Sequence, residues 1–148
     1  MARSTGERAG RTDVPSPRSR PLTAAAVVAV LLGILTILSG GMVLFGGATV
    51  RAAAGDAVPF VLWFNFLSGF VYVIAGIGMF MRRRWALMLA TGLAIAIATV
   101  FALLGLHIYQ DGSFEMRTVA AMSLRLLVWL AIAAVAAQHL TPKGSRKG

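Results

Sequence analysis

Four long apolar stretches, separated by short polar ones, run along this chain of 148 residues. Each stretch is long enough to supply the ~20 apolar residues that a membrane-spanning helix needs. Because lipid offers the backbone no hydrogen-bond partners, such stretches cross a membrane as helices. The pattern therefore predicts an all-α integral membrane four-helix bundle. The expected helices cover residues 23–46, 59–81, 86–108 and 118–140.

Basic residues are distributed unevenly among the connections between these helices. Consecutive spans cross in alternating directions, so the bundle is expected to be antiparallel, up-down-up-down. The tails 1–21 and 142–148 and the turn 82–84 then share one side, with eleven of the fourteen Lys and Arg residues. Short loops rich in Lys and Arg stay in the cytoplasm. We therefore predict a multi-pass cell-membrane protein with both termini cytoplasmic.

The two ends of the chain differ in composition from its centre. Residues 1–21 are rich in Arg, Ser, Gly and Pro without apolar periodicity, which predicts a disordered basic cytoplasmic tail. Residues 142–148 form a second basic cytoplasmic tail, so the four-helix domain covers 22–141. A cleaved signal peptide is the alternative. Its apolar core would be shorter than 22–50, although the alanines at 52–54 imitate a cleavage site.

Composition narrows the classes of function further. The chain is 58% hydrophobic and 13% charged, against about 25% charged in soluble domains. It has no cysteine, which excludes disulfides, thiol redox chemistry and thiolate metal sites. The net charge is +9, but the basic residues flank the hydrophobic stretches, as is typical of membrane proteins. No nucleic-acid partner is therefore expected. Heavy use of alanine, arginine and glycine is typical of a GC-rich bacterial genome and favours a bacterial inner membrane.

Small residues at helical spacing are expected at the contacts between helices. In lipid, helices associate by close backbone approach, which small side chains permit. The expected contact residues are Gly40, Gly41, Gly46 and Gly47 in the first helix, Gly69 and Gly76 in the second, and Gly92, Ala96 and Thr99 in the third.

Arg125 interrupts the fourth apolar stretch, which carries no other charge between residues 118 and 138. A charged side chain at this depth costs roughly 2.5–3.5 kcal/mol on insertion scales, so Arg125 is a functional-site candidate. Trp129 lies one turn later on the same face. It either fills the core of the bundle or supports the guanidinium by a cation–π contact.

Several polar side chains are expected near Arg125, in the outer half of the bundle. A rise of about 1.5 Å per residue places Asn65 at a similar depth. Thr118 and Met122 share a stripe with Arg125. Ser113 is expected to cap the fourth helix, and Glu115 to be the counter-ion of Arg125. The candidate polar cluster consists of Asn65, Tyr72, His107, Glu115 and Arg125.

This cluster has two interpretations. Arg125 is either a structural residue, satisfied by Asn65 and backbone carbonyls, or part of a site for an anion, a lipid headgroup or a quinone carbonyl. One histidine beside one glutamate falls short of the three protein ligands of catalytic zinc, so no metal is expected. No serine or cysteine nucleophile with a paired base is present, which disfavours an enzyme. Quinone is the one cofactor that the cluster suits.

The second and third helices resemble those of DoxX-like small membrane proteins over residues 62–90. Members of that family have a polar residue, then glycine, then an apolar stretch that ends in glycine and arginine. The corresponding residues here are Asn65, Gly69, Gly76, Gly78 and Arg82. Asn65 stands where that family usually has an acidic residue. The resemblance implies four helices and association with quinone-linked or oxidative-stress membrane complexes.

Three functions remain open from the sequence. The first is an interaction or accessory subunit, which assembles with a second copy or another membrane protein. The second is a lipid-, anion- or quinone-handling membrane protein that uses the cluster around Arg125. The third is an oligomeric transporter, since four short helices offer little cavity in a monomer.

Overall fold

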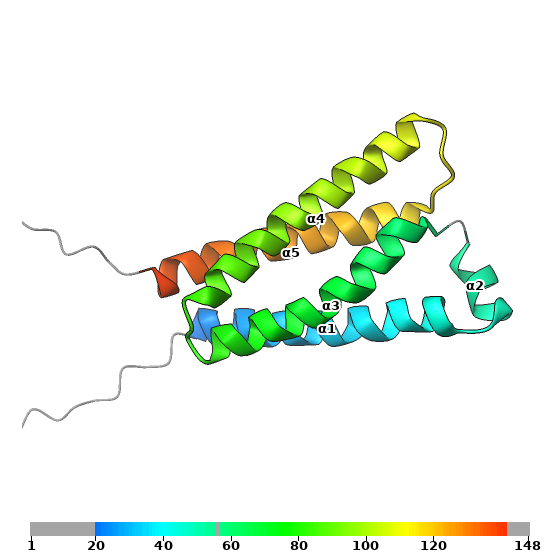
Figure 1. The fold of residues 1–148 in the computed structure, drawn as a ribbon. Coiled ribbons are helices and arrows are strands. Elements are labelled where there is room, and N and C mark those ends of the chain that lie inside the picture. The colour runs from blue at the N-terminus through cyan, green and yellow to red at the C-terminus, as the bar shows by residue number, and fades with distance from the viewer. Residues whose placement is uncertain (1–19, 56, 142–148) are drawn as a thin grey trace, which may run out of the picture.

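The computed structural model describes residues 20–55 and 57–141, and all regular structure in these residues is helical (Figure 1). The helices are α1 (Arg20–Phe45), α2 (Ala48–Ala54), α3 (Pro59–Phe80), α4 (Trp85–Tyr109) and α5 (Met116–Leu140). Four of them, all but α2, are long and apolar enough to cross a membrane. The all-α class is confirmed, and the four helices indicate a multi-pass membrane protein. The predicted tails lie outside the described residues, except that Arg20 and Pro21 already belong to α1.

Local sequence explains where the helices begin and end, within three residues of the predicted bounds. Pro59 opens α3, the helix position where a missing N–H costs nothing. Beyond α3, Arg82 adopts a left-handed φ of 55°. The Arg83 N–H donates to the Gly78 carbonyl at 2.9 Å, which closes a Schellman turn. Asp111, with a φ of 59°, ends α4 in the same way.

The main contacts between the long helices join α1, α3, α4 and α5 into a closed ring in that order. The tightest contact is between α1 and α3. A β-carbon added at Gly33 of α1 would lie 2.8 Å from the carbonyl oxygen of Gly69 on α3. One added at Gly76 would lie 2.9 Å from the carbonyl oxygen of Ala26. The predicted roles of Gly69 and Gly76 are confirmed, and Gly33 is an additional contact residue.

The prediction for the small residues of the third helix was wrong at Gly92 and Thr99. Both are exposed, and a β-carbon added at Gly92 would meet nothing within 4 Å. The buried face of α4 is rotated away from them. Its members are Ala86, Ala90, Leu93, Ala94, Ile97 and Leu104.

The core lies where the four long helices meet. Its largest fully buried side chains include Trp129, Tyr72 and Met122. The rings of Tyr72 and Trp129 pack against each other with centroids 4.8 Å apart. Trp129 is therefore a core residue, the first of its two interpretations. Met122 also belongs to this core.

The short helix α2 was not predicted. Its seven residues are all exposed or half-buried and follow directly after α1, so their sequence shows no separate apolar pattern. Two arginines hold α2 in place. Arg51 Nη2 donates to the Leu44 carbonyl at 2.9 Å, and Arg117 Nη2 donates to the Ala53 carbonyl at 3.3 Å. The helix ends at Gly55, whose φ is 67°.

Candidate functional site

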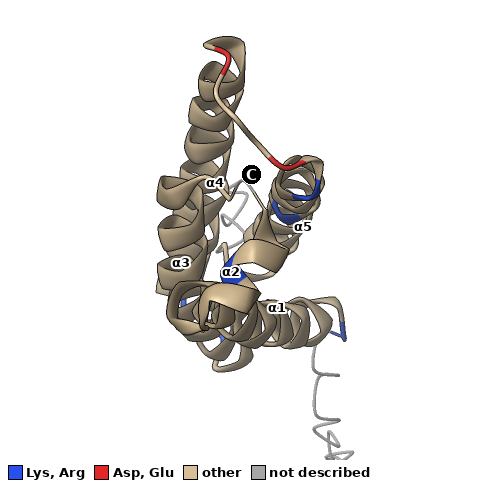
Figure 2. Cartoon of the chain, turned by 90° about the vertical axis from the view of Figure 1, so that its right-hand side faces the viewer, with Lys and Arg blue, Asp and Glu red and all other residues tan. Residues whose placement is uncertain are grey.

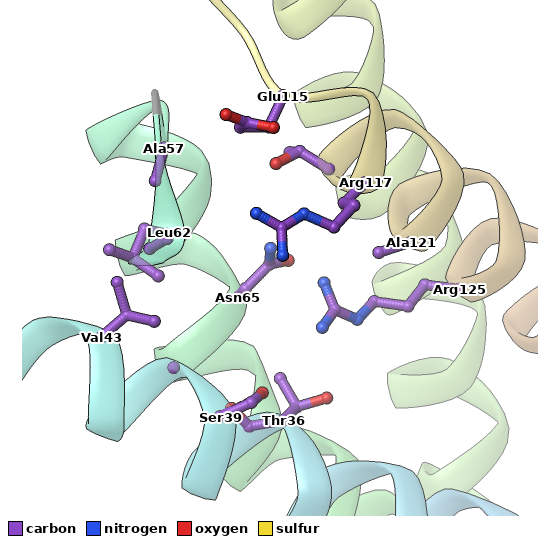
Figure 3. A pocket seen from close by; sticks show the side chains of 13 residues that line it. Thr36, Ser39, Val43, Ala57, Leu62, Asn65, Glu115, Arg117, Ala121 and Arg125 are labelled. Carbon is purple, nitrogen blue, oxygen red and sulfur yellow. The ribbon is translucent and has the colours of Figure 1, made fainter. Parts of the chain in front are cut away.

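A cavity of about 300 Å³ lies at the α2 end of the bundle (Figure 3). It is an open cavity, lined by the second half of α1, the first half of α3, the first half of α5 and the segment around α2. Figure 2 looks along the bundle from this end and shows basic positions on both α2 and α5. The polar residues of the lining are Thr36, Ser39, Asn65, Glu115, Arg117, Thr118 and Arg125.

The basic side of the cavity comes from a single face of α5. Arg117, Ala121 and Arg125 follow one another at intervals of four residues and therefore share that face. Figure 3 shows the two arginine side chains pointing across the cavity toward Asn65 on α3. The small side chain of Ala121 between them leaves space for both.

Asn65 and the hydroxyl groups of α1 form the opposite side. The Oδ1 atom of Asn65 is buried and has no hydrogen-bond partner among the described residues. Ser68 Oγ, one turn away, donates to the Asn65 backbone carbonyl at 3.0 Å and not to its side chain. A buried polar atom without a partner costs about 1–3 kcal/mol. Because this amide oxygen accepts hydrogen bonds, it suits an occupant that carries a donor group beside its anionic or carbonyl oxygens.

The guanidinium of Arg125 has no hydrogen bond or ion pair within residues 20–55 and 57–141. The structural interpretation of this residue required hydrogen bonds to Asn65 and to backbone carbonyls. Arg117 differs, because one of its nitrogens already donates to Ala53. Arg125 therefore keeps its fork of donors available to the cavity.

Glu115 lies at the end of the same cavity that is nearest α2. It occupies the N-cap position of α5, and its carboxylate packs against Gly55. The prediction that Ser113 caps this helix was wrong, because α5 begins at Met116, later than a Ser113 cap requires. Along α5, Arg117 stands between Glu115 and Arg125. The cavity thus has a carboxylate at its mouth and guanidinium groups further in.

Two residues of the predicted cluster do not line the cavity. Tyr72 lies two turns deeper than Asn65 and is fully buried against Trp129; its hydroxyl lacks a hydrogen-bond partner among the described residues. His107 is in the last turn of α4, where its ring packs on Phe60, with centroids 6.4 Å apart, and across Gly112. Because α4 diverges from α5 toward their connecting loop, this histidine is carried away from the cavity (Figure 1).

Sequence reasoning missed several lining residues. Arg117 was left out of the predicted cluster, although its spacing of eight residues from Arg125 places both on one face. Thr36 and Ser39, one turn apart, are the polar residues in the otherwise apolar second half of α1. Thr36 is only 2% exposed. The signal available in the sequence was this pair of hydroxyl residues, one turn apart in an apolar helix.

The donors of the cavity suit anions and carbonyl groups. No group of three His, Asp or Glu side chains gathers anywhere in the described part of the chain, so those residues provide no metal site. No protein-family model matches this chain, and no curated protein or solved structure is significantly similar to it. The cavity is therefore the main evidence of function in this chain.

Proposed function

We propose that this chain is a small multi-pass membrane protein that binds an anionic ligand between Arg117, Arg125 and Asn65. The observation that carries the proposal is the convergence of two guanidinium groups on one cavity inside a membrane-type bundle. The planar fork of arginine matches the oxygens of carboxylates and phosphates. Where water is scarce, such charge-assisted hydrogen bonds are strong.

The energetics support a ligand for Arg125. The residue lies nine positions after the start of α5, or about 13 Å into the helix. An arginine near mid-membrane costs roughly 2.5–3.5 kcal/mol. Each hydrogen bond to a charged group contributes about 1.5–3 kcal/mol. Two bonds to one bound anion therefore offset the cost of placing the charge there.

We further propose that the bundle is antiparallel, with both termini in the cytoplasm and the cavity on the opposite side. The positive-inside rule supports the cytoplasmic termini, and the joint lining of the cavity by late α1, early α3 and early α5 supports the antiparallel arrangement. Because the chain has no cysteine, single cysteines report the topology directly. Thr49→Cys on α2 should react with an impermeant maleimide in intact cells, and Met81→Cys only after lysis. The reverse pattern would refute this orientation.

A thermal-shift assay in detergent tests anion binding. The probes are inorganic phosphate, decanoate and phosphatidylglycerol, with phosphatidylcholine as the uncharged comparison. At least one anionic probe should raise the Tm. At a concentration a hundredfold above its Kd, such a probe stabilises the folded protein by up to about 2.7 kcal/mol. Arg125→Gln should abolish the shift, and Arg84→Gln, in the exposed turn between α3 and α4, should preserve it. Equal shifts in both variants would refute the proposal.

A quinone is an alternative occupant of the same donors, because its carbonyl oxygens accept hydrogen bonds from arginine and asparagine. The resemblance of residues 62–90 to DoxX-like proteins supports this alternative. A ubiquinone or menaquinone analogue added to the thermal-shift panel distinguishes the two. If only the quinone analogue stabilises the protein, and Arg125→Gln abolishes that effect, the ligand is a quinone and not an anion.

An interaction role is a second candidate, favoured by the outer face of α4. Gly92 is exposed there, with the exposed Thr99 two turns further along the same face, and an added β-carbon at Gly92 would meet nothing within 4 Å. Such a face allows another membrane helix to approach closely. We propose that a second copy or another membrane protein packs on it, which an oligomeric transporter would also require. Gly92→Ile should then dissociate a complex isolated in mild detergent; a wild-type chain that is monomeric and alone would count against this candidate.

A further inference from the structure

We infer that the occupant of the cavity is the phosphodiester headgroup of an anionic phospholipid, taken from the leaflet at the α2 end. This inference rests on the proposed anion-binding function and adds the chemical class of the ligand. Three properties of the cavity support it: its charge, its size and its position along the helices.

The charge of the lining matches a phosphodiester. Two guanidinium groups and one carboxylate line the cavity, a formal net charge of +1. A phosphodiester carries a single negative charge and several acceptor oxygens. Thr36 and Thr118 add hydroxyl donors to those of the arginines, whereas Ser39 Oγ already donates to the Thr36 carbonyl at 3.3 Å. The site therefore offers one unit of compensating charge and several hydrogen bonds, which is what a lipid headgroup requires.

The size of the cavity exceeds that of a bare anion. A water molecule takes about 30 Å³ of liquid, so the cavity of about 300 Å³ has the volume of about ten waters. Pockets for organic ligands begin near this size. A single inorganic anion would leave most of the space unfilled, whereas a headgroup with its glycerol backbone would fill it.

The position of the cavity suits a ligand that is already in the membrane. The lining reaches from Arg117, in the first turn of α5, to Arg125, about 12 Å further along the helix. It therefore spans the depth from the headgroup layer into the hydrocarbon. A phospholipid holds its phosphate and its chains at these depths, while a soluble anion would have to leave water.

The seam between α1 and α5 provides a path for the lipid. These helices contact each other far less than α1 and α3 do. The seam also holds an apolar groove of about 400 Å³, which begins at Val128, one turn beyond Arg125. Its residues are Pro21, Ala24, Ala25, Val28, Val128, Ala131, Ile132 and Val135. A headgroup in the cavity can thus enter sideways, with an acyl chain along the seam.

Native mass spectrometry of the full chain in detergent micelles tests this inference. Phosphatidylglycerol should bind at least about tenfold more tightly than phosphatidylcholine of the same acyl chains, given the strength of hydrogen bonds to charged groups. Arg125→Gln and Arg117→Gln should each weaken the binding of phosphatidylglycerol about tenfold, and the control Arg84→Gln should not. An excess of inorganic phosphate should not displace the lipid.

Each other outcome has a distinct meaning. Displacement of the lipid by an equal concentration of inorganic phosphate would show a free-anion site, which overturns this inference and keeps the proposed function. Lipid binding that ignores charge and both arginines would overturn both. If Arg125→Gln does not fold, Ala121→Leu fills the space between the arginines without removing a charge. Unchanged binding of phosphatidylglycerol in that variant would equally overturn the inference.

Discussion

Replacing Gly33 by alanine tests whether close backbone approach holds α1 against α3. The added β-carbon would lie 2.8 Å from the Gly69 carbonyl oxygen and 3.0 Å from the Val73 nitrogen. Both obstacles are backbone atoms, so no change of rotamer relieves the contact. The two helices would have to separate, and overpacking of this kind costs about 1–3 kcal/mol.

Gly92→Ala is the matched control. It makes the same chemical change within a helix, at a position where the new β-carbon meets nothing within 4 Å. Both variants gain the same helix propensity of about 1 kcal/mol, so the difference between them isolates the contact. Gly33→Ala should therefore have a free energy of unfolding about 1–3 kcal/mol lower than that of Gly92→Ala.

Reversible unfolding in mixed micelles of a mild detergent and dodecyl sulfate, followed by tryptophan fluorescence, measures this difference. Trp129 is fully buried in the core and reports its loss. Equal unfolding free energies for the two variants would refute the glycine contact as the basis of the α1–α3 pair. A larger loss in Gly92→Ala would instead show that the outer face of α4 is covered.

Two further changes test local features of the fold. Tyr72→Phe removes a buried hydroxyl that has no partner among the described residues, so the free energy of unfolding should stay unchanged or rise; a loss above about 1 kcal/mol in the same unfolding assay would reveal a partner. Asp111 has a left-handed backbone conformation at the end of α4, which glycine adopts without steric cost. Asp111→Gly should therefore raise the Tm and the free energy of unfolding, the latter by about 0.5–1 kcal/mol, while Asp111→Ala should lower both. A higher Tm for the alanine variant than for the glycine variant would contradict the left-handed conformation.

The sequence was sufficient for the long helices because lipid imposes a simple rule on them. Every backbone group must be paired inside the apolar stretch, so the length of the stretch sets the helix. That rule does not apply to α2, which lies between two spans. The hydrogen bonds from Arg51 to Leu44 and from Arg117 to Ala53 depend on the folded arrangement, so the sequence does not predict them. The rotation of α4 was equally beyond reach, because its stretch is apolar on all sides and Gly92 resembles a contact residue.

The candidate site was predictable in depth but not in direction. Helical rise alone placed Asn65 and Arg125 at the same level, and both line the cavity. Depth alone also selected His107, yet its ring packs against Phe60 and Gly112, and His107 is not among the residues that line the cavity. Arg117 was overlooked because a charge at the end of a span has an ordinary topological explanation. Which helices become neighbours is a property of the packed bundle.

The unequal contacts of α1 have a mechanical consequence. Interlocked glycines fasten this helix to α3, whereas its boundary with α5 is loose and lined by small side chains. Thermal breathing of the bundle will therefore concentrate on the weaker side and leave the stronger one shut. We therefore expect that a ligand which enters the bundle sideways does so between α1 and α5.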